Sequence, residues 1–128
     1  YKGGVVVYSR DMLKAMGIAD EIVRQHGMVS QESATAMAQT VRERLGADFG
    51  IGLSGTPGPS ELEGKPLGLA FLAISGATGV KELEMRLPPR QITVKRRVSN
   101  TALIELRRLL TATATQSRGC GKPQADVG

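Results

Sequence analysis

A tyrosine, a serine and a lysine near the N-terminus are residue types that together can activate a hydroxyl group. Tyr8 and Ser9 close the apolar run GGVVVYS at residues 3–9, which predicts a buried strand, and Lys14 follows within one or two helical turns. Strand ends often carry site residues in open sheets, and desolvation lowers the pKa of a lysine so that it can act as a base. Packing and helix capping are the alternative roles for the same residues.

A second candidate is the stretch LSGTPGPSELEGKPLG at residues 53–68, which lies between two apolar runs. Backbone N–H groups in a glycine-rich turn after a strand can approach a phosphate or a carboxamide closely. The stretch lacks the Gly-Lys-Ser/Thr ending of a P-loop, and prolines rather than a helix follow it. It is therefore either a ligand cradle or a plain connection between strands, in which Lys65 would be a solvated loop residue.

The other chemically active side chains form no recognisable set. His26, the only histidine, precedes a glycine between two predicted helices and is interpreted as a turn or capping residue. Cys120 is the only cysteine, so there is neither a disulfide framework nor metal-ligand spacing. One or two members of a basic set, otherwise a solvated face, could meet a ligand phosphate: Arg86, Arg90, Lys95, Arg96, Arg97, Arg107 and Arg108.

Composition points to a small anionic partner. The net charge of +5 favours anions, but only 3% of the residues are aromatic, and single-stranded nucleic acid usually needs several exposed rings for stacking. Nucleic acid is therefore an unlikely partner, although duplex binding through phosphates stays open. No apolar run approaches a membrane span and the N-terminus is no signal peptide, so we expect a cytoplasmic protein without a membrane partner.

The elements that must position these residues follow from hydrophobic spacing. Continuous apolar runs predict strands buried on both faces, an alternating run predicts a strand nearer an edge, and helical spacing predicts helices. Asp20 and Ser30 are the candidate N-caps, and Gly46 is a candidate helix stop. The predicted elements are strands at 3–9, 49–54, 67–75 and 80–88, the last being the edge strand, and helices at 10–17, from 20, 30–46 and 91–110.

These elements define the fold class and the domain organisation. We predict an α/β domain over residues 1–112, with helices packed on a mixed sheet, followed by a flexible polar tail at residues 113–128. The run at 3–9 has no upstream partner, so we expect these 128 residues to lack a strand and a helix that complete the sheet. An unpaired apolar strand invites pairing between copies, and we expect a homo-oligomer.

Five segments together resemble one known family. YKGGVVVYS, HGMVS, SGTPGP, GKPLGLAFLAI and VKRRVSNTALIELRRLL occur in the order and approximate spacing of the CinA C-terminal domain, from residue 1 to about residue 110. This competence/damage-inducible protein family includes nicotinamide mononucleotide deamidases. The resemblance implies a three-layer α/β/α sandwich, a small anionic nucleotide substrate, no cofactor, and hydrolysis of nicotinamide mononucleotide to nicotinic acid mononucleotide and ammonia.

The resemblance also implies roles for particular residues. The family is similar to serine–lysine amidohydrolases, in which a lysine is the base and backbone amides stabilise the oxyanion. On this basis the catalytic candidates are Lys14 and Tyr8. The substrate-binding candidates are Ser9, Ser54, Gly55, Thr56, Gly58, Pro59 and Lys65.

Two departures from the family pattern leave alternatives open. The family's nucleophilic serine lies in a Glu-Ser-x-Thr-Gly-Gly motif upstream of the Gly-Gly-Val-Val strand, and this sequence begins after that motif. The family's lysine follows the tyrosine by five residues, where Leu13 stands, and Lys14 is one residue late. Besides an amidohydrolase-like domain, the alternatives are a catalytically silent binder of a nucleotide or a protein, and a basic nucleic-acid-associated module.

Overall fold

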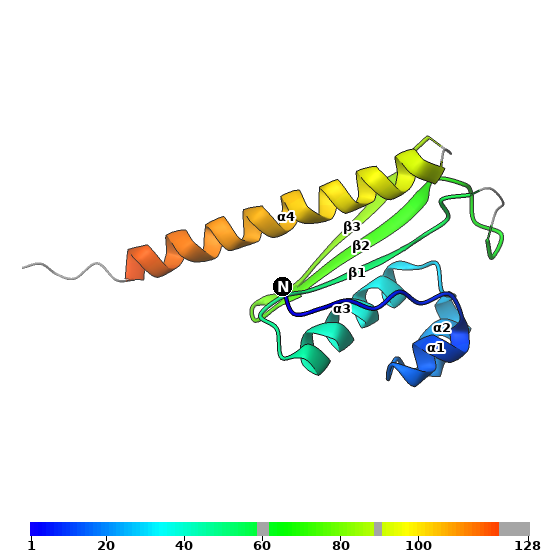
Figure 1. Ribbon diagram of the computed structural model, residues 1–128, viewed down its shortest axis with the longest axis horizontal. Coiled ribbons are helices and arrows are strands. Elements are labelled where there is room, and N and C mark those ends of the chain that lie inside the picture. The colour runs from blue at the N-terminus through cyan, green and yellow to red at the C-terminus, as the bar shows by residue number, and fades with distance from the viewer. Residues whose placement is uncertain (59–61, 89–90, 121–128) are drawn as a thin grey trace, which may run out of the picture.

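A computed structural model describes residues 1–58, 62–88 and 91–120 of the chain. Three short to medium helices precede three strands, and one long helix follows them (Figure 1). The elements are α1 (Arg10–Ala15), α2 (Asp20–His26), α3 (Gln31–Leu45), β1 (Gly50–Gly55), β2 (Leu69–Gly76), β3 (Gly79–Arg86) and α4 (Gln91–Cys120).

The three strands form one sheet in the order β1-β2-β3, with β2 in the centre. Leu72 of β2 pairs with Leu53 on one side and with Leu83 on the other, and both pairings are antiparallel. β2 is buried on both faces and β3 is largely exposed, which confirms the predicted edge strand. The prediction of a mixed sheet is wrong for the described strands, because none of them runs parallel to its neighbour.

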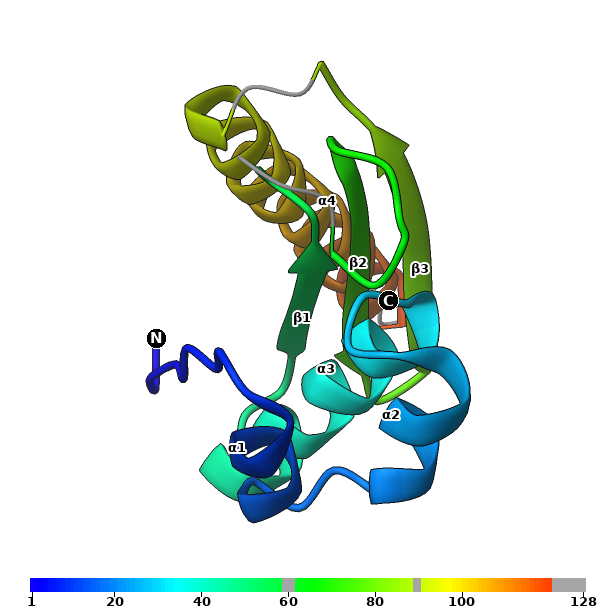
Figure 2. The same cartoon turned by 90° about the vertical axis from the view of Figure 1, so that its right-hand side faces the viewer.

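Residues 3–9 were predicted to form a buried strand, and that prediction is also wrong. The segment forms no strand, and it lies beyond the β1 edge of the sheet (Figure 2). Val6 and Tyr8 are 74% and 86% exposed, and only Val7 packs against the cluster formed around α1 and α2. β-branched residues favour extended backbone, but a strand also needs a hydrogen-bonded neighbour, which this segment does not reach.

Helices cover both faces of the sheet (Figure 1). On one face, α4 packs Val94, Val98 and Ala102 against alternate residues of β2. On the other face, Ala34 and Ala38 of α3 pack against Ala73 and Phe71 of β2, and α1 and α2 lie beyond α3. The α/β class is confirmed, and this layering agrees with a three-layer α/β/α arrangement.

The helix ends follow local chemistry with one exception. Ser30 caps α3 by accepting a hydrogen bond from the Ser33 amide, and Gly46 ends the helix in the left-handed conformation, as predicted. The predicted N-cap at Asp20 is wrong, because Ala19 occupies the cap position. Asp20 instead forms ion pairs with Arg10 and Arg24, at 3.1 and 3.0 Å.

The last helix is ten residues longer than predicted. α4 continues through Cys120, so the part of the predicted flexible tail at 113–120 is helical, while residues 121–128 lie outside the described residues. Residues 111–118 lack apolar periodicity, but they contain no glycine or proline that would stop a helix. The end of α4 therefore projects past the sheet (Figure 1).

The closest approach between layers joins α3 to β1. Gly52 lies so near the helix that a Cβ placed on it would be 1.9 Å from the Ala34 carbonyl oxygen and 2.8 Å from the Ala38 amide nitrogen. At Gly50 a Cβ would be 2.1 Å from the Ala38 carbonyl oxygen. Glycine in the strand and alanine in the helix together set this short spacing.

Replacing Gly52 by alanine should therefore destabilise the domain strongly. The new methyl group would meet helix backbone, which cannot rotate away, so we expect a loss of about 3 kcal/mol or more in the free energy of unfolding. Gly46→Ala is the control, because no atom lies within 4 Å of its Cβ position and only the left-handed backbone is penalised, by about 1–2 kcal/mol. Urea unfolding of both variants measures the difference; equal losses would contradict the packing described above.

Candidate functional site

A hollow opens between the sheet and α4 where β1 ends. Its volume is about 300 Å³. Leu53, Ala70, Val94 and Val98 give it apolar walls, and Lys95 and Ser99 add a cation and a hydroxyl from the N-terminal part of α4. The end of β1 and the turn that follows complete it with Ser54, Gly55 and Pro57. The first residues of the 53–68 stretch thus border this hollow.

Two side chains predicted to bind substrate in this turn are hydrogen-bonded to main chain. The Ser54 hydroxyl donates to the Met28 carbonyl at 2.5 Å. The Thr56 hydroxyl donates to the Pro66 carbonyl at 2.5 Å, and Thr56 is almost fully buried. In this arrangement both residues shape the turn, and a ligand would meet the turn through its backbone.

The predicted substrate-binding Lys65 is neither a solvated loop residue nor free. Its ammonium group donates to the carbonyls of His26, at 3.1 Å, and Val29. It also lies 3.8 Å from the Glu63 carboxylate, and its side chain is only 29% exposed. Lys65 therefore links the 62–65 turn to the loop between α2 and α3.

Glu63 is a polar residue of this region that sequence reasoning missed. Its carboxylate accepts hydrogen bonds from the amides of Met28, at 2.8 Å, and Val29, at 3.1 Å. Two oppositely charged side chains of the 53–68 stretch, Glu63 and Lys65, thus hold the HGMVS segment. The one signal available was the pair Glu63-Gly64, a dipeptide with a glycine where a tight turn needs one.

The N-terminal candidates lie apart from this network. Ser9 caps α1, because its hydroxyl accepts a hydrogen bond from the Met12 amide at 3.2 Å. The structure thus shows the helix-capping alternative for Ser9. Tyr8 and Lys14 are exposed. Within the described residues, no hydrogen bond or ion pair joins Tyr8 or Lys14 to the turn after β1.

Of the remaining candidates from the sequence, Gly58 is among the described residues, and Pro59 and Arg90 are not. Gly58 adopts a φ of 105°, which favours glycine, and it follows the residues that border the hollow. In the part of the chain that the structure covers, no group of three or more His, Cys, Asp or Glu side chains could hold a metal ion, and no helix is long and apolar enough to cross a membrane.

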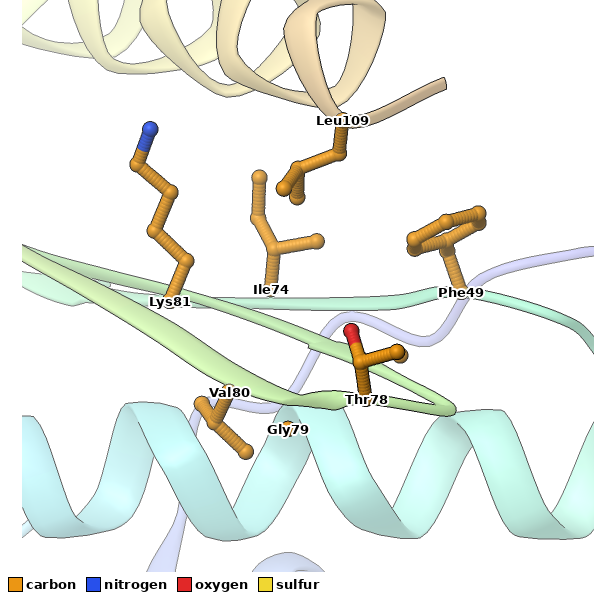
Figure 3. A pocket seen from close by; sticks show the side chains of 8 residues that line it. Phe49, Ile74, Thr78, Gly79, Val80, Lys81 and Leu109 are labelled. Atoms are coloured by element: carbon orange, nitrogen blue, oxygen red, sulfur yellow. The ribbon is translucent and has the colours of Figure 1, made fainter. Parts of the chain in front are cut away.

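A second, smaller hollow lies at the opposite end of β1, by the β2–β3 turn (Figure 3). Its volume is about 170 Å³, and Phe49, Ile74 and Leu109 line it together with Lys81. None of the site residues predicted from the sequence borders it. Its size and apolar lining suit a packing defect under α4 better than a nucleotide site.

Beside this hollow, α4 carries a buried carboxylate. Glu105 is 7% exposed, and it binds the Lys81 ammonium group and, at 2.7 Å, the Arg108 guanidinium group. The hydrogen bond from Lys81, assisted by the charge of Arg108, keeps the pKa of Glu105 below its ordinary value although burial raises it. This ion pair ties α4 to the edge strand β3.

Comparison with known proteins places the chain in a family. The family model described as the CinA C-terminal domain matches residues 1–110. The chain is 38% identical over 102 residues to a putative competence-damage inducible protein of Desulforamulus reducens, covering 79% of this chain and 25% of the relative. It is 33% identical over 111 residues to a CinA-like protein of Frankia casuarinae, covering 86% and 26%. The chain therefore spans about a quarter of the length of these curated relatives.

Solved structures agree with this assignment. The competence/damage inducible protein CihA from Agrobacterium tumefaciens superposes with a TM-score of 0.75 at 31% identity, covering 80% of this chain and 65% of that one. A CinA superfamily protein from Enterobacter cloacae superposes with a TM-score of 0.76 at 26% identity, covering 80% and 62%. The chain belongs to the CinA C-terminal domain family.

The Glu105 ion pair generates a prediction about acid stability. A carboxylate whose pKa is lower in the folded than in the unfolded chain stabilises the fold above its unfolded pKa, and this contribution is lost as the pH falls through the folded pKa. Lys81→Met should remove the largest cause of the lowering, so the melting temperature should fall at neutral pH and less at pH 3. Melting curves of wild type and variant from pH 3 to 7 test this; a loss of equal size at every pH would contradict it.

Proposed function

We propose that this domain binds a pyridine mononucleotide in the hollow beside the turn after β1 and takes part in hydrolysing nicotinamide mononucleotide to nicotinic acid mononucleotide and ammonia. The observation that carries the proposal is the hollow itself. The hollow combines apolar walls with one cation. It borders the SGTPGP segment, one of the five segments that resemble the CinA C-terminal domain, and that resemblance implies this substrate. Its volume of about 300 Å³ is near the lower end for small-ligand sites.

Lys95 is the residue best suited to the nucleotide phosphate. Within the described part of the chain its ammonium group forms no hydrogen bond or ion pair, so its charge is uncompensated beside the hollow. Ser99 lies one helical turn further along α4 and could donate a hydroxyl hydrogen bond to the same group. The apolar walls would receive the ring or the ribose face.

The turn after β1 can contribute backbone amides to the reaction. The Thr56 amide already donates to the Leu69 carbonyl at 2.8 Å, and Pro57 has no N–H. Gly55 and Gly58 therefore provide the turn's candidate donors to the oxyanion that forms when a hydroxyl attacks the carboxamide. In the proposed reaction that hydroxyl is supplied by polypeptide outside residues 1–128, and Lys14 is the candidate base.

A catalytically silent binder is the second candidate, and the setting of Lys14 favours it. A lysine base is normally desolvated or placed beside another cation, because either lowers its pKa. Lys14 is exposed, and no described residue forms a hydrogen bond or ion pair with its ammonium group. The same hollow would then bind a nucleotide without turnover.

Lys95→Gln should weaken binding of nicotinamide mononucleotide to this chain by about tenfold or more, because the phosphate loses a charged hydrogen bond. Arg97→Gln is the matched control: it removes the same charge from an exposed position on α4 that does not border the hollow. Isothermal titration calorimetry at two salt concentrations measures both, and the salt effect should be modest. Equal losses in the two variants would refute the assignment of Lys95. An affinity for duplex DNA that is higher and falls steeply with salt would favour the nucleic-acid alternative.

Lys14→Met separates the enzyme from the silent binder. In a longer family protein that contains this domain and the serine motif, the variant should abolish ammonia release while leaving nucleotide affinity nearly intact, because a base acts on the reaction and not on the phosphate. Unchanged turnover in the variant would show that Lys14 is not the base. A wild type that binds the nucleotide and releases no ammonia would support the silent binder.

A further inference from the structure

We infer that Glu63 is a positioning residue, which acts with Lys65 as a clasp on the loop at residues 26–30 and thereby fixes the turn that borders the hollow. This inference rests on the proposed function for its consequence in nucleotide binding. Neither residue lines the hollow, so neither would touch the nucleotide there. Their effect on the site would pass through the 26–30 loop.

The clasp holds both kinds of main-chain group in the loop. Glu63 accepts from two successive amides, those of Met28 and Val29, with one carboxylate oxygen for each. Lys65 donates to carbonyls on either side of them, those of His26 and Val29. A carboxylate and an ammonium group thus replace the backbone pairing that this irregular segment lacks.

Gly27 admits the carboxylate to this position. A Cβ on Gly27 would lie 2.2 Å from Oε2 of Glu63, and its φ of 86° is one that side chains rarely adopt. The glycine of the HGMVS segment is therefore explained by the approach of a side chain from the other loop.

The backbone of Glu63 itself is strained. Glu63 and Gly64 have φ values of 56° and 70°, and the Lys65 amide donates to the Leu62 carbonyl at 3.0 Å, which defines a tight turn with positive φ at both central residues. Such turns favour Asn-Gly, and among the described residues Glu63 is the one non-glycine residue with positive φ. A glutamate at this position suits the clasp better than it suits the turn.

Met28 connects the clasp to the hollow. Its amide is bound by Glu63, and its carbonyl accepts the Ser54 hydroxyl at 2.5 Å. Ser54 lies at the end of β1, where it borders the hollow, and Gly55 follows it. Displacement of Met28 would therefore release the residue that precedes the candidate amide donor of Gly55.

Two substitutions of Glu63 separate the clasp from the turn. Glu63→Gln keeps the length of the side chain but leaves one acceptor oxygen in place of two. Glu63→Asn favours the turn backbone but is too short to reach Met28 and Val29. A role confined to the turn predicts that Glu63→Asn leaves these amides protected, whereas the clasp predicts that they exchange about tenfold faster or more in both variants.

Hydrogen exchange of individual amides by NMR, on this chain, is the primary measurement. Glu84→Gln is the control, because its carboxylate is exposed and pairs only with the exposed Arg86 among the described residues. Faster exchange at Met28 and Val29 in both Glu63 variants, with no change in the control, would establish the clasp. Faster exchange at Thr56, whose amide donates to the Leu69 carbonyl, would establish its connection to the turn. Unchanged exchange at Met28 and Val29 in either variant would overturn the clasp, and unchanged exchange at Thr56 would overturn its connection to the turn.

Titration with nicotinamide mononucleotide tests the consequence for binding. We expect affinity to fall about tenfold in both Glu63 variants and in Lys65→Met, and to stay unchanged in Glu84→Gln. Wild-type affinity retained in the Glu63 variants would overturn the positioning role even if exchange becomes faster. If the wild type binds no nucleotide, the proposed function fails, and the exchange data alone establish or overturn the clasp.

Discussion

The rest of the structure depends on the close contact between α3 and β1. Because glycines at 50 and 52 face alanines 34 and 38, helix backbone lies directly against strand backbone, without side chains to separate them. This short spacing brings the N-terminus of α3, and the loop that precedes it, beside the end of β1. The hydroxyl of Ser54 can reach the Met28 carbonyl only because the two elements lie so close. The contact that holds two layers together also aligns the two loops of the candidate site.

The polar groups around the site divide into those that build it and those left for a ligand. Ser54, Thr56, Glu63 and Lys65 all bind main-chain groups of the protein. Loop backbone near a site must be satisfied when it is partly buried, and here side chains do this in place of regular secondary structure. Lys95 differs, because no described residue compensates its charge. Recognition of an anion would therefore depend on Lys95 of α4. Sequence reasoning named Lys95 only as one member of a basic set.

Local patterns predicted most of the elements, and long-range contacts account for what they missed. The central strand, the edge strand, the Ser30 cap and the Gly46 stop were predicted because apolar spacing and capping chemistry are local properties. The run at 3–9 was assigned to a buried strand, but it forms none, since strand formation depends on a neighbour as much as on β-branched residues. The extension of α4 to Cys120 was missed because residues 111–118 lack an apolar stripe, although nothing in them stops a helix. The contacts of Glu63 could not be predicted from the sequence, since its partners Met28 and Val29 are more than thirty positions away.

The outer edge of β1 is where the segment at 3–9 could pair with the described sheet. β1 is an outer strand of the described sheet, and the segment at 3–9 lies beyond that edge (Figure 2). Val6 and Tyr8 of this segment are exposed. An open strand edge and exposed apolar side chains are both unfavourable in water, and both would be relieved if extended backbone paired with β1. If that pairing were parallel, the chain around Tyr8 would lie toward the end of β1, where Ser54 and Gly55 border the hollow. In the structure the segment at 3–9 pairs with no described strand, and Lys14, which follows it in α1, has no hydrogen bond or ion pair to the turn after β1.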